Sequence, residues 1–194
     1  MNLYFSTNCL NSSFKETLET FNNVGVEKIE LSFTRELIKN LKKMLAKYCF
    51  ESVLVHNYFS SDSDVILNLS SRNKGILKET IKYAKNAIDF CVDIKSPMFT
   101  IHAGFTADPL KIVGDIDRIT QDLNDKHESI ARMIDSILII SEYAKDRGIN
   151  FGIENHTTNS YLDKYVLLAD IKSMKTFFSL LSDSNVELLL DIGH

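Results

Sequence analysis

The sequence is poor in the residues that break or cross-link a chain. It has 7 glycines and 2 prolines among 194 residues, too few for a β-sandwich rich in turns or for long linkers. Its 3 cysteines, Cys9, Cys49 and Cys91, are odd in number and widely spaced, which argues against a disulfide framework and against a CxxC metal site. We therefore expect a protein of a reducing compartment, the cytoplasm.

Long apolar runs and a strong excess of one charge are also missing. No apolar run approaches the about 20 residues that a membrane span needs, and Met1–Leu10 lacks the basic start and apolar core of a signal peptide. The 22 Lys and Arg against 26 Asp and Glu leave a net charge of −4, which gives no overall attraction to nucleic acid or to an anionic membrane. The length is that of one domain, and we expect a single domain over residues 1–194.

Short apolar or β-branched runs alternate along the chain with stretches of helical spacing. We predict strands at Asn2–Ser6, Glu27–Ser32, Glu51–His56, Met98–His102, Asn150–Asn155 and Val186–Ile192. We predict helices at Ser13–Val24, Thr34–Tyr48, Asn73–Val92, Glu128–Arg147 and Asp170–Ser182. Because neighbouring parallel strands need a crossover helix, this strict alternation predicts a parallel α/β sheet.

Two α/β architectures fit this order of elements. One is an open doubly wound sheet, and the other is a (β/α)8 TIM-type barrel of parallel strands with units missing. Ligands bind at the carboxyl ends of the strands in both. The two long connections, Ser60–Ser71 and Phe105–Lys126, follow strands, so we expect both at that rim.

Ionisable side chains stand near the carboxyl ends of five predicted strands. They are Glu30, His56, His102, Glu154 and Asp191, and His194 follows the last of them by three residues. A buried parallel strand normally reads as continuous Val, Ile and Leu. An ionisable group in such a strand must therefore be paired, neutralised or bound to a metal.

The alternation of side chains across a strand sorts these residues by face. Glu154 and Asp191 alternate with apolar neighbours, on the sixth strand Leu188, Leu190 and Ile192, which we expect to pack on the helices. Both carboxylates then point into the barrel, and His56 and His102 do so by the same rule. Two carboxylates and two imidazoles suit a divalent ion, Zn²⁺ where nitrogen ligands prevail and Mn²⁺ or Mg²⁺ where oxygen prevails.

Each of these residues also has a structural interpretation. A single histidine at a strand end is more often a satisfied core residue, and Glu30 fits an ion pair with a neighbouring Lys or Arg. His156, just past Glu154, fits either packing or a substrate contact in the pocket. Gly104 is expected to permit a tight turn after the fourth strand. Glu154 and Asp191 are the hardest to explain without a ligand, because an inward carboxylate on a parallel strand is costly.

The motifs around these residues resemble those of the xylose-isomerase-like TIM-barrel superfamily, which includes sugar isomerases, sugar epimerases and zinc-dependent apurinic endonucleases. They are GVEKIEL around Glu30, VHNYF and LNLSS around His56 and Asn68, IHAG around His102, IEN around Glu154, and DIGH around Asp191 and His194. The resemblance implies that Glu154 and Asp191 ligate the metal and that Glu154 is also the acid–base of an epimerase. It implies that His194 binds substrate or a second zinc, and that His56 and His102 are zinc ligands in the endonucleases.

The chain departs from that family in its number of strands. The family barrel has eight strands and typically about 250 residues, whereas this chain has six predicted strands and 194 residues. The first and sixth strands would then be open edges, and unpaired edges invite association. We expect a barrel truncated after strand six of eight, or one completed by another chain, including a homo-oligomer formed through the open edges.

Three functions remain open at this point. The first is a metal-dependent sugar or sugar-phosphate isomerase or epimerase, in which Glu154 abstracts a proton next to a carbonyl and the metal stabilises the enediolate. The alternative is a zinc-dependent apurinic endonuclease-like phosphodiesterase, which the histidines favour. DNA binding needs Lys or Arg at several phosphates, yet residues 105–126 carry five aspartates against three basic residues, so we expect a small sugar as the partner and no nucleic acid. The third is a non-catalytic binding barrel.

Overall fold

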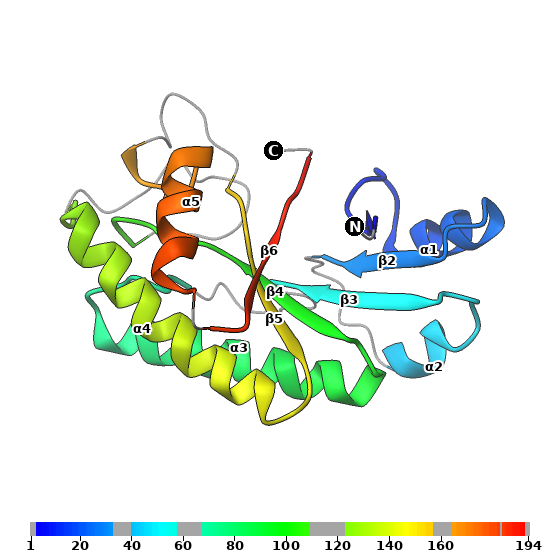
Figure 1. The fold of residues 1–194 in the computed structure, drawn as a ribbon. Helices are drawn as coiled ribbons and strands as arrows, with labels where there is room; N and C mark the ends of the chain where they lie inside the picture. Colours follow the sequence, from blue (N-terminus) through cyan, green and yellow to red (C-terminus); the bar gives the residue numbers. More distant parts are fainter. Residues whose placement is uncertain are drawn as a thin grey trace.

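The computed structural model describes residues 3–32, 40–57, 67–108, 123–156, 164–182 and 184–192. Six strands alternate with five helices in these residues (Figure 1). In chain order they are β1 (Phe5–Ser6), α1 (Phe14–Asn23), β2 (Lys28–Leu31), α2 (Leu41–Leu45), β3 (Ser52–His56), α3 (Lys74–Ile94), β4 (Met98–His102), α4 (Lys126–Lys145), β5 (Asn150–Glu154), α5 (Ile171–Leu180) and β6 (Val186–Leu189). Both the number and the order of elements confirm the alternation predicted from the sequence.

All neighbouring strands pair in parallel, in the order β1-β2-β3-β4-β5-β6. A doubly wound sheet reverses its strand order at a switch point, and this sheet does not. The strictly sequential order is that of consecutive (β/α) units of a TIM-type barrel. Of the two architectures that fit the sequence, the structure therefore selects the barrel, with β1 and β6 as the two edges of the described sheet.

Polar caps define the starts of the longer helices. The Ser13 hydroxyl accepts from the Glu16 amide while the Glu16 carboxylate accepts from the Ser13 amide, a reciprocal capping box for α1. Asp125 caps α4 and Asp170 caps α5 through their carboxylates. Gly25 and Gly148 follow α1 and α4 with φ angles of 78° and 69°, the left-handed conformation that glycine adopts without strain.

One face of the sheet packs on the helices and forms the core. Its strand residues are Ile29, Leu31, Val55, Phe99, Ile101, Phe151 and Ile153, all buried. Figure 1 shows α3 and α4 running along this side of the sheet. The Phe99 and Phe151 rings stack on neighbouring strands, with centroids 6.0 Å apart. The even-numbered residues of these strands, which alternate with the core residues, consequently face the other way, into the barrel.

Leu188 of β6 is in register with the core residue Ile153, so it lies on the helix side of the sheet, yet it is not covered. Leu188, Leu190 and Ile192 are 45%, 59% and 85% exposed, so the expectation that they pack on the helices is wrong. The helix before β6, α5, directs Phe177 into the core and leaves these three side chains open.

Two further points complete the fold. The predicted helix Thr34–Tyr48 is represented by the short α2, Leu41–Leu45, and its first half lies outside the described residues. Within the described parts of the chain, no helix combines the length and the apolar character needed to cross a membrane.

Candidate metal centre

The parallel register brings three predicted site residues to the same face at the carboxyl ends of β3, β4 and β5. His102 pairs with Glu154 across β4 and β5, and His56 pairs with Thr100 across β3 and β4. In a parallel sheet the side chains of paired residues point to the same side, so His56, Thr100, His102 and Glu154 all face the barrel interior. The inward direction predicted for both histidines and for Glu154 is confirmed.

His56, His102 and Glu154 form a buried cluster. Each offers one nitrogen or oxygen atom, and the three atoms lie within 4.8 Å of one another. The Nδ1 atom of His56 is 2.8 Å from Oε2 of Glu154 and 2.9 Å from the Thr100 hydroxyl oxygen. The side chains of His56 and Glu154 are only 6% and 3% exposed. Thr100 and Glu154 thus both contact the His56 ring at Nδ1 and fix its orientation.

These donors fit a divalent ion. Zn²⁺ binds nitrogen and oxygen at roughly 2.0–2.1 Å, so two ligands of one tetrahedral ion lie about 3.3 Å apart. The separations in the cluster, from 2.8 Å to within 4.8 Å, bracket that spacing. Two imidazoles and one carboxylate are the ligand types of zinc and of manganese. The identity of an ion is not given by these groups alone.

Carboxylates surround His56 and change its protonation. Burial on its own would lower the pKa of His56, but the hydrogen bond and charge of Glu154, with the charges of Glu30 and Asp191, raise it above its ordinary value. Without an ion, the imidazolium–carboxylate pair therefore persists to higher pH than a free histidine allows. An ion bound here would displace the proton that this pair holds.

Glu30 lies at the edge of this charge cluster, on β2. Its register partner is Leu54 on the inward face of β3. Burial raises the pKa of Glu30, and the carboxylates of Glu154 and Asp191 raise it further, while His56 and the Ser6 hydroxyl act in the opposite direction. The pocket position predicted for Glu30 stays a prediction, but its register with Leu54 puts it on the same interior face.

His156 packs behind the cluster. Its ring centroid is 4.8 Å from that of His102 at an interplanar angle of 31°, and 5.0 Å from that of Phe105. The His102 and His56 rings meet edge to face, also at 4.8 Å. His156 is buried, so its described contacts are aromatic packing. A substrate contact of His156 stays a prediction.

Asp191 lies beyond the end of β6, next to the carboxyl end of β5. The Asn155 side chain donates to the Asp191 carbonyl at 3.1 Å and accepts from the Asp191 amide at 2.7 Å. Among the described residues, the group close enough to share one ion is limited to His56, His102 and Glu154. Metal ligation by Asp191 stays a prediction, and His194 lies outside the described residues.

Three residues contribute to this region besides the candidate site residues. Thr100 carries a signal, because it is the polar residue inside the otherwise apolar run MFTI of β4. Phe105 carries none, since an aromatic residue after a strand is usually packing. Asn57 follows His56 in the left-handed conformation, φ 52°, and its buried Oδ1 has no hydrogen-bond partner among the described residues. Asparagine tolerates that conformation better than most residues.

Gly104 has a different role from the one predicted. A Cβ atom built on it would come within 2.5 Å of the Ser70 hydroxyl and 2.9 Å of the Asn68 side-chain oxygen. Its φ angle is not positive, so the prediction of a glycine-dependent tight turn is wrong. The glycine is required because another segment approaches the backbone after β4 too closely for any side chain.

Comparison with known proteins places this fold. The family model described as "Xylose isomerase-like TIM barrel" matches residues 16–194. The chain belongs to this family. That membership confirms the resemblance inferred from the strand-end motifs. The chain matches none of the curated proteins.

Solved structures of similar fold include several sugar epimerases. A D-tagatose 3-epimerase-like protein has 22% identity and a TM-score of 0.68, and the match covers 100% of this chain and 66% of that one. An L-ribulose 3-epimerase has 17% identity and a TM-score of 0.69, with coverage of 97% and 60%. A D-psicose 3-epimerase with D-tagatose from Clostridium cellulolyticum H10 has 16% identity and a TM-score of 0.63, with coverage of 96% and 62%.

At these identities the likeness concerns the fold. The chain spans 66% or less of the length of these three structures.

Proposed function

We propose that this chain carries the metal site of a sugar or sugar-phosphate isomerase or epimerase that moves a proton on a carbon next to a carbonyl. The observation that supports it most is the buried cluster of Glu154 with His56 and His102 on the inward face, at the strand ends where TIM-barrel enzymes hold their catalytic groups. The solved epimerases of the same fold support the substrate class.

Glu154 is the proton-transferring group in this proposal. A divalent ion, when bound, polarises the carbonyl and the neighbouring hydroxyl of a sugar. The C–H hydrogen on the hydroxyl-bearing carbon next to the carbonyl then becomes more acidic. Of the cluster residues, Glu154 is the carboxylate and hence the base best suited to remove that hydrogen. His56 holds Glu154 through the 2.8 Å contact, and His102 lies beside it on β4. Glu154, Asp191, His56 and His102 are the proposed ligands, with His194 at the substrate.

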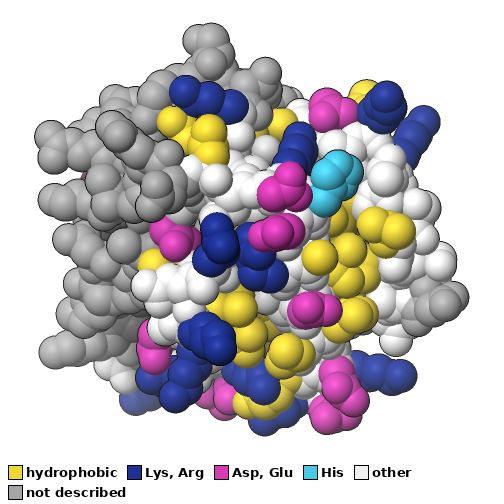
Figure 2. Space-filling view, turned by 90° about the vertical axis from the view of Figure 1, so that its left-hand side faces the viewer, with side chains coloured by type: hydrophobic (Ala, Val, Ile, Leu, Met, Phe, Trp, Pro, Cys, Tyr) yellow, Lys and Arg dark blue, Asp and Glu magenta, His cyan; other side chains and the backbone are white. Residues whose placement is uncertain are grey.

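A second candidate, a zinc-dependent phosphodiesterase like the apurinic endonucleases, is favoured by one observation. Two of the three clustered groups are imidazoles, a nitrogen-rich set that zinc prefers. The aspartates of residues 105–126 weigh less against DNA binding than their number indicates, because two of them have structural partners. Asp108 accepts hydrogen bonds from Asn68 and Ser71, and Asp125 caps α4. On the face in Figure 2, however, acidic and basic side chains are interspersed and form no continuous basic surface.

Solvent hydrogen exchange tests the proposed reaction. Ketoses and ketose phosphates are incubated with the protein and Mn²⁺ or Zn²⁺ in D₂O, and deuterium beside the carbonyl is measured by NMR. We expect exchange that falls by about 10²–10⁴-fold in Glu154→Gln, the usual contribution of a general base. Glu187→Gln is the matched control, because Glu187 is an exposed carboxylate on neighbouring β6, and we expect no change.

The outcomes separate the candidate functions. Exchange that survives Glu154→Gln would contradict the assignment of the base. Cleavage of an oligonucleotide at an abasic site, without ketose exchange, would favour the phosphodiesterase. A protein that binds neither Zn²⁺ nor Mn²⁺ and catalyses neither reaction would leave a non-catalytic binding barrel.

A further inference from the structure

The side-chain amide of Asn68 binds the segment that follows β4 and the neighbouring Ser70. Its Oδ1 accepts from the Phe105 amide at 2.9 Å, from the Ser70 amide at 3.1 Å and from the Ser70 hydroxyl at 2.8 Å. Its Nδ2 donates to the Phe105 carbonyl at 3.1 Å and to the Asp108 carboxylate at 2.9 Å. Asn68 is 2% exposed. Both backbone polar groups of Phe105 therefore bind Asn68, 37 residues earlier in the sequence, and the Phe105 carbonyl also accepts from the Ser70 hydroxyl.

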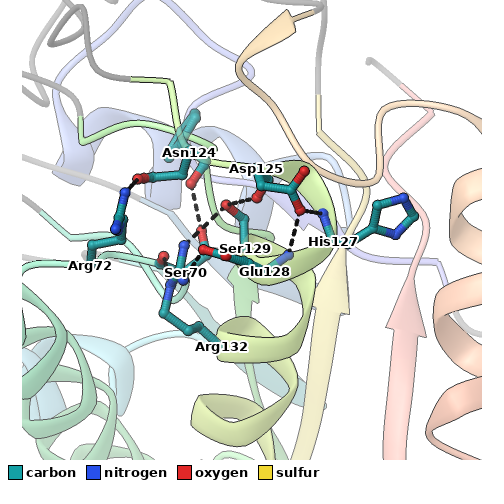
Figure 3. A network of polar contacts seen from close by, with 9 residues as sticks. Ser70, Arg72, Asn124, Asp125, His127, Glu128, Ser129 and Arg132 are labelled. Carbon is teal, nitrogen blue, oxygen red and sulfur yellow. Dashed lines mark hydrogen bonds and ion pairs between the residues drawn. The ribbon is translucent and has the colours of Figure 1, made fainter.

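The segment that carries Asn68 is itself anchored to α4. The guanidinium of Arg132 donates to the Ser70 carbonyl at 3.0 Å, as the close-up of this network shows (Figure 3). The Ser136 hydroxyl donates to the Leu69 carbonyl at 2.8 Å. Because α4 packs into the core, these two hydrogen bonds hold the Asn68 segment in a fixed position relative to the core.

Asn68 reaches the cluster through a row of aromatic rings. Phe105 lies three residues after His102 and packs edge to face on His156 at 5.0 Å. His156 packs on His102, and His102 packs on His56, each at 4.8 Å. A displacement of Phe105 therefore changes the surroundings of His156, and then of His102.

We propose that Asn68 is a positioning residue of the cluster: it fixes Phe105 so that the Phe105 and His156 rings hold the His102 imidazole in place. The proposal rests on the proposed function only in taking His102 as a metal ligand. The close approach at Gly104 serves the same arrangement, since a side chain there would collide with Asn68 and Ser70. A side-chain amide accepts through its oxygen and donates through its nitrogen, so one asparagine can bind both the N–H and the carbonyl of the same residue.

The test compares two asparagines that gain the same charge. Asn68→Asp removes both donated hydrogen bonds and places a carboxylate against the Phe105 carbonyl and Asp108. Asn73→Asp is the control, because the Asn73 side chain accepts from the Gly75 and Ile76 amides at the start of α3 and makes no donated hydrogen bond within the described residues, and aspartate accepts equally well. The measurement is the set of NOEs between the His102, His156 and His56 rings, which needs no metal.

We expect Asn73→Asp to keep these NOEs and Asn68→Asp to lose those of His102, with a second set of His102 signals. Titration with Zn²⁺ alone against a competing chelator should show a loss of about 10–100-fold for Asn68→Asp, as for other groups that orient metal ligands. If wild-type protein binds neither Zn²⁺ nor Mn²⁺, the proposed function fails, while the NOEs still decide the positioning role.

A second variant guards against loss of folding. Phe105→Leu keeps the backbone atoms that Asn68 binds and removes only the ring against His156, so we expect a folded protein that loses the His102–His156 NOE and the single His102 conformation. Unchanged ring NOEs in folded Asn68→Asp, or in Phe105→Leu, would overturn the proposal.

Discussion

Strands β5 and β6 are neighbours paired over four residues, yet their burial differs greatly. From Phe151 to Glu154 every residue of β5 is buried, whereas β6 is half-buried or exposed throughout. In the described sheet β5 has a strand on each side and α4 packed against it, but β6 has a strand on one side. An apolar run in the sequence thus predicts β5 and β6 equally well as strands. The strands and helices that pack against each one decide which of the two is buried in the core.

The largest effect that tests this comparison is the deletion of one large apolar side chain from each strand. We expect Phe151→Ala on β5 to lower the free energy of unfolding by about 3–5 kcal/mol, because the ring leaves a cavity in the core. Leu188→Ala on β6 should lower it by about 1 kcal/mol or less, since that side chain is half in solvent. Urea unfolding measures both. Equal losses would mean that Leu188 is covered in solution.

The inward face of β5 is tight at Gly152. A Cβ there would lie 2.5 Å from Cε of Met98 and 3.1 Å from Cγ2 of Thr100. We expect Gly152→Ala to lower the free energy of unfolding by about 1–3 kcal/mol, the usual cost of overpacking. Met98→Ala should relieve part of this loss in a double-mutant cycle. A simple sum of the two single effects would show that the collision with Met98 is not the cause.

Asn155 links the two strands beyond the end of their paired region. We expect Asn155→Ala to lower the free energy of unfolding by about 1–2 kcal/mol, because both side-chain hydrogen bonds to Asp191 are lost. Hydrogen exchange of the Asp191 amide should become much faster, while amides inside β5 keep their protection. If the Asp191 amide exchanged as slowly as before, another group would hold the end of β6.

The smallest effects concern the helices that lead into the two strands. Hydrogen bonds from the Glu128 and His127 amides lower the pKa of Asp125 at the start of α4, and those of Ser173 lower the pKa of Asp170 at the start of α5. A lowered pKa in the folded state adds stability above the unfolded value of about 3.9, and this is lost as the pH falls through the folded value.

We therefore expect Asp125→Asn and Asp170→Asn to flatten the fall in stability between about pH 5 and pH 2, while the caps persist, because asparagine also accepts these bonds. Thermal unfolding across that range measures the slope. An unchanged acid slope in either variant would show that its carboxylate adds no pH-dependent stability.

Much of the candidate site could be predicted from alternation along single strands. The period of two correctly directed His56, His102 and Glu154 into the barrel, because that rule depends only on the local backbone. It gave the right face for Leu188 but the wrong burial, since burial depends on what packs against that side chain. The role of Asn68 could not be predicted, because its partners at Phe105 and Asp108 lie 37 and 40 residues away.

The sequence by itself determined the alternating elements, their caps and the face of each strand that carries chemistry, because these follow from backbone geometry over a few residues. Only the tertiary structure decided that the strands follow one another in barrel order, that three strand ends bring His56, His102 and Glu154 within 4.8 Å, and that Gly104 makes room for Asn68. Those outcomes depend on contacts between segments far apart in the chain, and no local pattern encodes a distance between them.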